Sequence, residues 1–148
     1  MQTRDIVQKG IPAALAALLL SACPHAPIPQ QAGGNWHHLG EAANGNQMLA
    51  LDTNSIKREG PLARFRDRKI IVDMAAERFV NTPPFKTSIS HWEIHCTNKT
   101  FRLTANTLYD DKGNIISDEK YTAIDIRPMS IPPNSLTEEQ RKLVCPAN

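Results

Sequence analysis

A strict alternation of side chains between residues 88 and 96 is the feature that most constrains how this chain can fold. Successive side chains of a β-strand point to opposite faces of a sheet, so a period of two predicts a half-buried strand. One face of this strand would carry Ser90, Trp92, Ile94 and Cys96, and the other would carry Ile89, His91, Glu93 and His95. We expect the face with Trp92 and Ile94 to be the core face.

Similar short segments, separated by turn residues, extend from Trp36 to Ile126. Residues 36–39 and 48–52 predict a first hairpin, and the run 62–74 predicts a longer strand that ends before Asn81-Thr-Pro-Pro84, since proline cannot donate to a sheet ladder. After the turn Asp110-Asp-Lys-Gly113, a last strand is expected toward Ile126. The segment 100–109 is predicted to be a strand. The side chains on one of its faces would be Phe101, Leu103, Ala105, Thr107 and Tyr109. Six antiparallel strands and a mainly β (α+β) fold follow.

One helix is predicted near the C-terminus. Ser135 is followed three residues later by Glu138, which is the spacing of a capping box at a helix start. A helix of about 10 residues is marginal alone, so we expect its Leu143-Val144 side to cover the sheet.

The N-terminus has the pattern of a bacterial signal peptide. Arg4 and Lys9 precede an apolar run from Ile11 to Leu20, which has about half of the roughly 20 apolar residues that a membrane span needs. The run ends in Leu20-Ser-Ala-Cys23, which resembles a lipobox, so Cys23 is predicted to be lipidated and to become the first residue. The alternatives are a secreted protein cleaved nearby and a chance motif in a buried helix.

Two further features define the predicted organisation. Pro24 follows the cysteine where retention in the inner membrane would favour Asp, so we expect sorting to the outer membrane of a Gram-negative bacterium. We also expect attachment to that membrane through the lipid and display on the cell surface. Residues 24–35 contain three prolines and two glycines, a composition typical of an extended tether. The predicted units are a signal peptide (1–22), a lipidated cysteine with its tether (23–35) and a β domain (36–148).

Cysteine usage predicts one disulfide bond. If Cys23 carries lipid, two of the three cysteines remain, Cys96 and Cys145, in a compartment that is oxidising enough to join them. The bond would attach the helix to the sheet. Two separate buried thiols and a shared metal ion are the alternatives.

Charge and motifs exclude several functions. The chain has 17 basic and 15 acidic residues, a balance too even for a protein that neutralises many nucleic-acid phosphates, so no nucleic-acid partner is expected. No Gly-x-Ser-x-Gly, phosphate-binding glycine loop or Cys-x-x-Cys motif occurs. The carboxylate pairs 110–111 and 138–139 fall in a turn and a first helical turn, where solvation and the helix dipole explain them. We expect no enzymatic activity and no cofactor.

The polar face of residues 88–96 carries side chains that can bind metal ions. His91 and His95 would lie about 13 Å apart on an extended strand, too far to share one ion with Glu93 unless a neighbouring strand contributed. The adjacent His37 and His38 would point to opposite faces. We interpret these residues as solvated side chains and expect no metal.

A cationic row and an aromatic loop are the candidate partner-binding residues. Arg64, Arg66 and Arg68 would share one strand face, which either attracts an anionic partner or keeps an exposed strand soluble. Phe79, Phe85 and Lys86 lie in the loop around Pro83-Pro84, where the aromatic rings either anchor a partner or fold back onto the core.

The layout of the whole chain resembles the surface-adhesin protein E family, known from Haemophilus. The resemblance covers about residues 36–146 and is carried by the order and spacing of Leu20-Ser-Ala-Cys23, Trp36 with Leu39, residues 51–56, Cys96, Tyr109-Asp-Asp-Lys-Gly113, Ile131-Pro-Pro-Asn-Ser135 and Cys145. This chain has Pro133-Asn134-Ser135 where the family commonly has Pro-Gly-Ser.

The family resemblance implies a six-stranded sheet whose concave side holds the C-terminal helix by a disulfide. It also implies homodimer formation and adhesion to host matrix or serum proteins of the vitronectin, laminin and plasminogen class. A lysozyme inhibitor and a structural envelope lipoprotein are the alternative functions.

Overall fold

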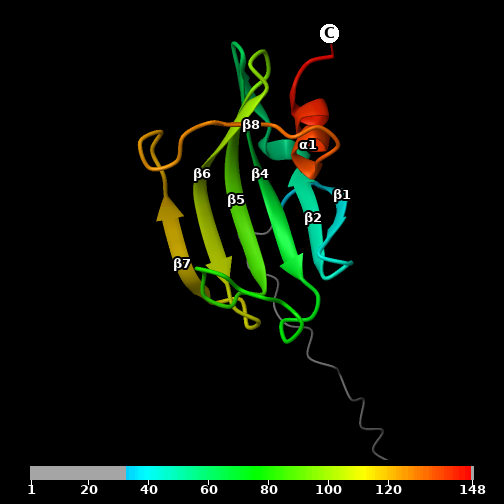
Figure 1. Cartoon of the computed structure of the whole chain (residues 1–148), viewed down its shortest axis with the longest axis vertical. Coiled ribbons are helices and arrows are strands. Elements are labelled where there is room, and N and C mark those ends of the chain that lie inside the picture. Colours follow the sequence, from blue (N-terminus) through cyan, green and yellow to red (C-terminus); the bar gives the residue numbers. More distant parts are fainter. Residues whose placement is uncertain (1–32, 148) are drawn as a thin grey trace, which may run out of the picture.

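The described part of the chain, residues 33–147 of a computed structural model, forms one antiparallel sheet and one α-helix (Figure 1). The predicted signal peptide, Cys23 and residues 24–32 of the predicted tether lie outside the described residues. The elements are β1 (Trp36–Ala42), β2 (Gln47–Asp52), the short 3₁₀-helix η2 (Thr53–Ser55), β3 (Lys57–Glu59), β4 (Leu62–Ile71), β5 (Thr87–His95), β6 (Thr100–Tyr109), β7 (Ile115–Lys120), β8 (Met129–Ser130) and α1 (Leu136–Val144). No helix within residues 33–147 is long and apolar enough to cross a membrane.

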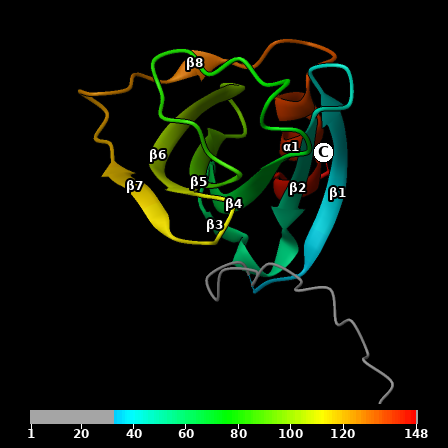
Figure 2. The same ribbon diagram turned by 90° about the horizontal axis from the view of Figure 1, so that it is seen from below.

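The main path of the sheet has the order β1-β2-β4-β5-β6-β7, with every neighbouring pair antiparallel. This order confirms the predicted set of six strands. Two short strands were not predicted: β3 pairs with the start of β4, and β8 pairs with the start of β6. The sheet curls into a half-barrel with α1 on its concave face (Figure 2), as expected.

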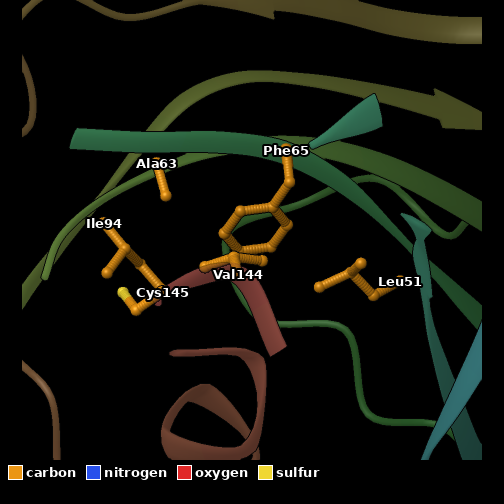
Figure 3. Close-up of a cluster of buried hydrophobic side chains, with 6 residues drawn as sticks. All are labelled: Leu51, Ala63, Phe65, Ile94, Val144 and Cys145. Carbon is orange, nitrogen blue, oxygen red and sulfur yellow. The ribbon is translucent and has the colours of Figure 1, made fainter. Parts of the chain in front are cut away.

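The face of the sheet that packs against α1, which we call the helix face, contains the main core. Six buried side chains form this core: Leu51, Ala63, Phe65, Ile94, Val144 and Cys145 (Figure 3). Trp92 and Cys96 pack against it, so the predicted core face of β5 is confirmed. A disulfide joins Cys96 to Cys145 with the two Cα atoms 5.7 Å apart, which confirms the predicted bond between helix and sheet.

The start of α1 follows the sequence signal in part. Ser135 is the N-cap, and its Oγ accepts a hydrogen bond from the backbone N–H of Glu138 at 3.2 Å. The Glu138 side chain pairs with Arg141 at 2.8 Å instead of closing the capping box, because Arg141 offers a charged donor one turn away. Asn134, the residue before this N-cap, has a φ of 57°, a left-handed conformation that Asn adopts more readily than most residues.

The prediction for β6 was wrong beyond Leu103. His91 of β5 lies opposite Ala105, whereas the next residue, Trp92, lies opposite Leu103, so Thr104 is an extra residue that forms a β-bulge. The hydroxyl of Thr104 donates to the His91 carbonyl at 3.1 Å. Phe101 and Leu103 therefore lie on the helix face. After the bulge, Ala105, Thr107 and Tyr109 lie on the other face of the sheet.

A second, smaller core lies at the end of β4, between the sheet and the loop of residues 72–86. Ile71, Phe85 and Leu108 are buried there, with Met74 and Phe79 packed against them. The rings of Phe79 and Phe85 meet edge to face with centroids 5.4 Å apart. The loop therefore folds back onto the core, which was one of its two predicted roles.

Candidate functional site

The predicted arginine row lies on the side of the sheet away from α1, which we call the opposite face. Ala63, Phe65 and Asp67 of β4 are buried on the helix face, so alternation turns Arg64, Arg66 and Arg68 to the opposite face. The three arginines share a face, as predicted, but each has a neighbour within the domain that the sequence did not identify.

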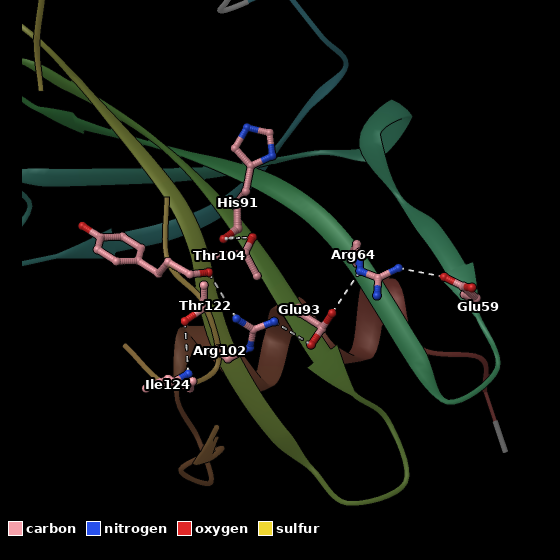
Figure 4. Close-up of polar contacts among 9 residues, drawn as sticks. Glu59, Arg64, His91, Glu93, Arg102, Thr104, Thr122 and Ile124 are labelled. Atoms are coloured by element: carbon pink, nitrogen blue, oxygen red, sulfur yellow. Dashed lines mark hydrogen bonds and ion pairs between the residues drawn. The ribbon is translucent and has the colours of Figure 1, made fainter. Parts of the chain in front are cut away.

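Arg64 lies between two carboxylates (Figure 4). Its Nη1 is 2.8 Å from Glu59, across the β3–β4 hairpin, and its Nε is 2.9 Å from Glu93 on β5. The hydrogen bonds that the Arg64 guanidinium donates to Glu59 and Glu93 raise its pKa. Glu93 also pairs with Arg102 on β6 at 3.2 Å, so an ion-pair network spans the four strands β3, β4, β5 and β6.

Arg66 forms the most buried ion pair of the row. Its Nη2 lies 2.7 Å from Asp52, whose side chain is almost inaccessible, and it also donates to the Gly33 carbonyl. The Asp52 carboxylate accepts backbone N–H bonds from Asn35 at 2.9 Å and Asn54 at 3.1 Å. Burial opposes ionisation of Asp52, but these bonds and Arg66 outweigh it and lower the pKa of Asp52.

Arg68 stacks on an aromatic ring. Its guanidinium carbon lies 4.4 Å from the centroid of Trp36, and that of Arg66 lies 5.3 Å from the same ring. The Nε of Arg68 is buried and has no hydrogen-bond partner among the described residues. Burial lowers the pKa of Arg68.

The row therefore presents less free charge than the sequence indicates. Four guanidinium groups, including Arg102, face three carboxylates, Asp52, Glu59 and Glu93, so this set of seven described groups carries a net charge of +1. The side chain of Arg64 remains 48% exposed. Beside it, a hollow of about 640 Å³ is lined by Lys57, Arg64, Arg66, His91 and Thr104, among others.

The histidines of β5 have ordinary surroundings. Burial and the nearby Arg66 guanidinium lower the pKa of His91, which favours the neutral imidazole at pH 7. His95 accepts a backbone hydrogen bond from Asn98 at 3.1 Å, and Glu93 holds two arginines. No group of three or more His, Cys, Asp or Glu side chains within residues 33–147 is arranged to hold a metal ion.

The candidate loop residues lie beyond the arginine row, at the end of β4. Thr87 pairs with Ile70, two residues after Arg68, and the loop closes just beyond this pair. Lys86 Nζ donates to the Val72 carbonyl at 2.9 Å. Because Phe85 is buried and Phe79 packs against it, the interpretation of these rings as exposed anchors is not supported. Of the candidate loop residues Phe79, Phe85 and Lys86, only Lys86 carries a charge.

Comparisons with known proteins identify the fold and the family. A family model described as surface-adhesin protein E matches residues 36–146. Crystal form II of Haemophilus influenzae protein E aligns with a TM-score of 0.52 at 13% identity, covering 84% of this chain and 94% of that one. Its selenomethionine form aligns with the same TM-score and identity, covering 84% and 92%. No curated protein sequence gives a significant match.

At 13% identity the structural likeness shows the fold alone, and the family model carries the assignment. Its match runs from the first residue of β1 to the residue after Cys145, and so includes the whole sheet, the helix and the disulfide. The chain belongs to the surface-adhesin protein E family.

Proposed function

We propose that this chain is a lipid-anchored adhesin that binds host extracellular-matrix or serum proteins through its β domain. The observation that carries the proposal is the match of the surface-adhesin family model to residues 36–146, which is nearly all of the described domain. Vitronectin, laminin and plasminogen are the ligand class that the resemblance implies.

The anchor is part of the proposal. The signal peptide would be removed after residue 22, Cys23 would carry the lipid in the outer membrane, and residues 24–35 would connect it to the domain. The end of this tether is held by the domain: Asn35 N–H donates to Asp52, and the Asn35 carbonyl accepts from Thr53 N–H at 2.9 Å. The chain therefore reaches the domain beside the Asp52–Arg66 pair, on the opposite face.

The exposed charges of the opposite face would contribute to the approach of a partner. Arg64 is half exposed. Lys86 lies apart from the row, in the loop after β4, where it donates to the Val72 carbonyl. Exposed charges mainly accelerate association, and physiological salt screens them beyond about 8 Å. Arg66 and Arg68 would contribute by holding their neighbours in place, since Arg66 pairs with Asp52 and Arg68 stacks on Trp36.

A binding experiment tests the proposal. Purified residues 24–148 should bind immobilised vitronectin, laminin or plasminogen at micromolar or lower concentration, and should leave lysozyme activity unchanged. Lack of binding to all three proteins would contradict the adhesin function. Inhibition of lysozyme would favour the inhibitor alternative.

A further inference from the structure

Most of the exposed large hydrophobic side chains gather at one end of the domain. We define the loop end as residues 41–48, 72–86 and 110–116, which lie at the lower end of the sheet in Figure 1. Of the seven exposed large hydrophobic residues in the described chain, five belong to the loop end: Met48, Val72, Val80, Ile115 and Ile116. Scattered exposed apolar residues are ordinary, but a gathering of this kind is typical of interaction surfaces.

Backbone pairing makes the loop end continuous across the sheet. Met48 lies opposite Ile70, Ile70 opposite Thr87, Thr87 opposite Tyr109, and Tyr109 opposite Ile115. These five paired residues form one row along the border of the loop end, and Met48 and Ile115, at its two ends, are exposed. Four strand spacings of about 4.8 Å give the row a length of roughly 19 Å. The loop 72–86 is bonded to the same row, since Val72 N–H donates to Asn46 and Lys86 N–H donates to Tyr109, both at 2.8 Å.

The exposed aliphatic side chains belong to an ordered surface. Asn46 Nδ2 donates to the Asp73 carbonyl at 3.0 Å and to Glu77 at 2.9 Å, and the Asp73 N–H donates back to Asn46 at 2.8 Å. Phe79 is packed in the second core, yet the next residue, Val80, stays 61% exposed. A surface held in one conformation loses little entropy when it binds a partner.

The charges of the loop end indicate the kind of partner. Its segments contain three basic residues, Arg78, Lys86 and Lys112, and five acidic ones, Glu41, Asp73, Glu77, Asp110 and Asp111. Lys86 is bonded to the Val72 carbonyl. These five acidic residues, which we call the acidic rim, outnumber the basic ones by two. The surplus disfavours anionic lipid headgroups, which attract basic segments, and complements a basic polypeptide.

We propose that the loop end is the docking surface for a polypeptide segment of a partner protein that carries both apolar and basic side chains. The segment's apolar side chains cover Val72, Val80 and Ile115, and its basic side chains meet the acidic rim. This inference rests on the proposed adhesin function and names the surface and the partner chemistry that it uses.

Two matched double variants test the apolar contact. Val80→Ser with Ile115→Ser removes exposed apolar groups from two segments of the loop end. Ile124→Ser with Met129→Ser removes two exposed apolar groups from outside it, 90% and 48% exposed, compared with 61% for Val80 and 53% for Ile115. Binding of residues 24–148 to immobilised vitronectin, laminin and plasminogen is measured, with thermal unfolding as the folding control. Since each side chain is already exposed, neither pair should change the fold.

The loop-end pair should weaken binding at least tenfold, because burial of two aliphatic side chains is lost. The control pair should change binding less than twofold. Equal binding by the loop-end pair and the wild type, or equal weakening by both pairs, would overturn the docking surface while leaving the adhesin function intact. Failure of the wild type to bind any of the three proteins would overturn both.

A charge variant tests the partner chemistry. Asp111→Lys replaces a negative charge with a positive one at an exposed turn, so it should weaken binding about threefold or more at low salt and by less at high salt. Stronger binding by Asp111→Lys would contradict a basic partner. Wild-type binding to vesicles with 30% phosphatidylglycerol that exceeds binding to the three proteins would replace the polypeptide with a lipid surface.

Discussion

The two faces of the sheet each bury an aspartate, and the two carboxyl groups have opposite surroundings. Asp52, on the opposite face, is 2% exposed and is paired with Arg66. Asp67, on the helix face, is 6% exposed and is held by Gln140 of α1, whose Nε2 donates to it at 2.6 Å. Charged hydrogen bonds lower the pKa of Asp52, whereas burial raises the pKa of Asp67 to about 6.

This difference shows that the two faces are stabilised in different ways. The helix face combines apolar burial, a disulfide and two hydrogen bonds, from Gln140 Nε2 to Asp67 and from Arg58 Nε to the Val144 carbonyl. No ion pair joins α1 to the sheet among the described residues. The opposite face depends on ion pairs and arginine–tryptophan stacking. Reduction and changes near pH 6 should therefore affect the helix face, and acid and salt should affect the opposite face.

Loss of the disulfide should have the largest effect. The bond closes a loop with a sequence separation of 49 residues, and the chain-entropy relation gives a stabilisation of roughly 4 kcal/mol for a loop of this size. Cys96→Ser with Cys145→Ser should lower the free energy of unfolding by about this amount in urea titrations. Amide hydrogen exchange should become faster in α1 before it does so in the sheet. A loss below about 1 kcal/mol would show that packing alone holds the helix.

Asp67→Asn should stabilise the domain at neutral pH. The folded-state pKa lies above the ordinary value of 3.8, so protonation favours the fold and its stabilisation is lost as the pH rises through about 6. The variant should gain about 2 kcal/mol at pH 7.5 and nothing near pH 4. Urea titrations at the two pH values measure this, with the exposed Asp111→Asn as the control. A loss of stability at pH 7.5 would mean that the Gln140 bond requires a charged carboxylate.

Asp52→Asn should have the opposite sign. The folded-state pKa lies below 3.8, so the ionised carboxylate stabilises the fold above that value and the stabilisation is lost as the pH falls through the lowered pKa. The loss at pH 7 should be about 1 to 2 kcal/mol, less than for a fully buried pair because Arg66 is 22% exposed. The loss should shrink toward pH 3 in the same titrations. A pH-independent loss would indicate that packing, not charge, is what Asp52 contributes.

Arg64→Gln should have the smallest effect. This side chain is half exposed and its ion pairs are screened, so thermal unfolding should stay unchanged. If the row helps to attract a partner, association with vitronectin or laminin should slow about two- to threefold at low salt, with little change at high salt. Arg64→Lys, which keeps the charge, is the control. A changed dissociation rate with an unchanged association rate would place Arg64 inside the contact instead.

Local patterns of the sequence predicted much of this fold. The alternation in β5 identified its core face, Ser135 identified the start of α1, and the count of cysteines identified the disulfide. Each of these features is determined by a few consecutive residues or by simple pairing. The bulge at Thr104 was missed because it depends on a hydrogen bond to the His91 carbonyl of the neighbouring strand, which leaves no mark in the alternation.

The candidate site was less predictable because it depends on strand register. The three arginines were placed on one face correctly, but Glu59 and Asp52 reach them only through the pairing of β3 and β2 with β4. Burial of Phe79 and Phe85 depends on the space that the curled sheet leaves next to Ile71 and Leu108. Residue type alone could not show whether these rings are buried. It favoured the aromatic side chains as partner-binding residues, whereas the exposed side chains of the loop end are aliphatic.

Surface display is the claim on which the adhesin account depends most directly. Antibodies against residues 33–147 can be applied to intact Gram-negative cells that express the full chain, with a periplasmic protein as the control for membrane integrity. The account predicts that the antibodies label intact cells as strongly as cells whose outer membrane has been opened. Labelling that appears only after the outer membrane is opened would contradict it, because a domain held inside the envelope cannot meet a host protein.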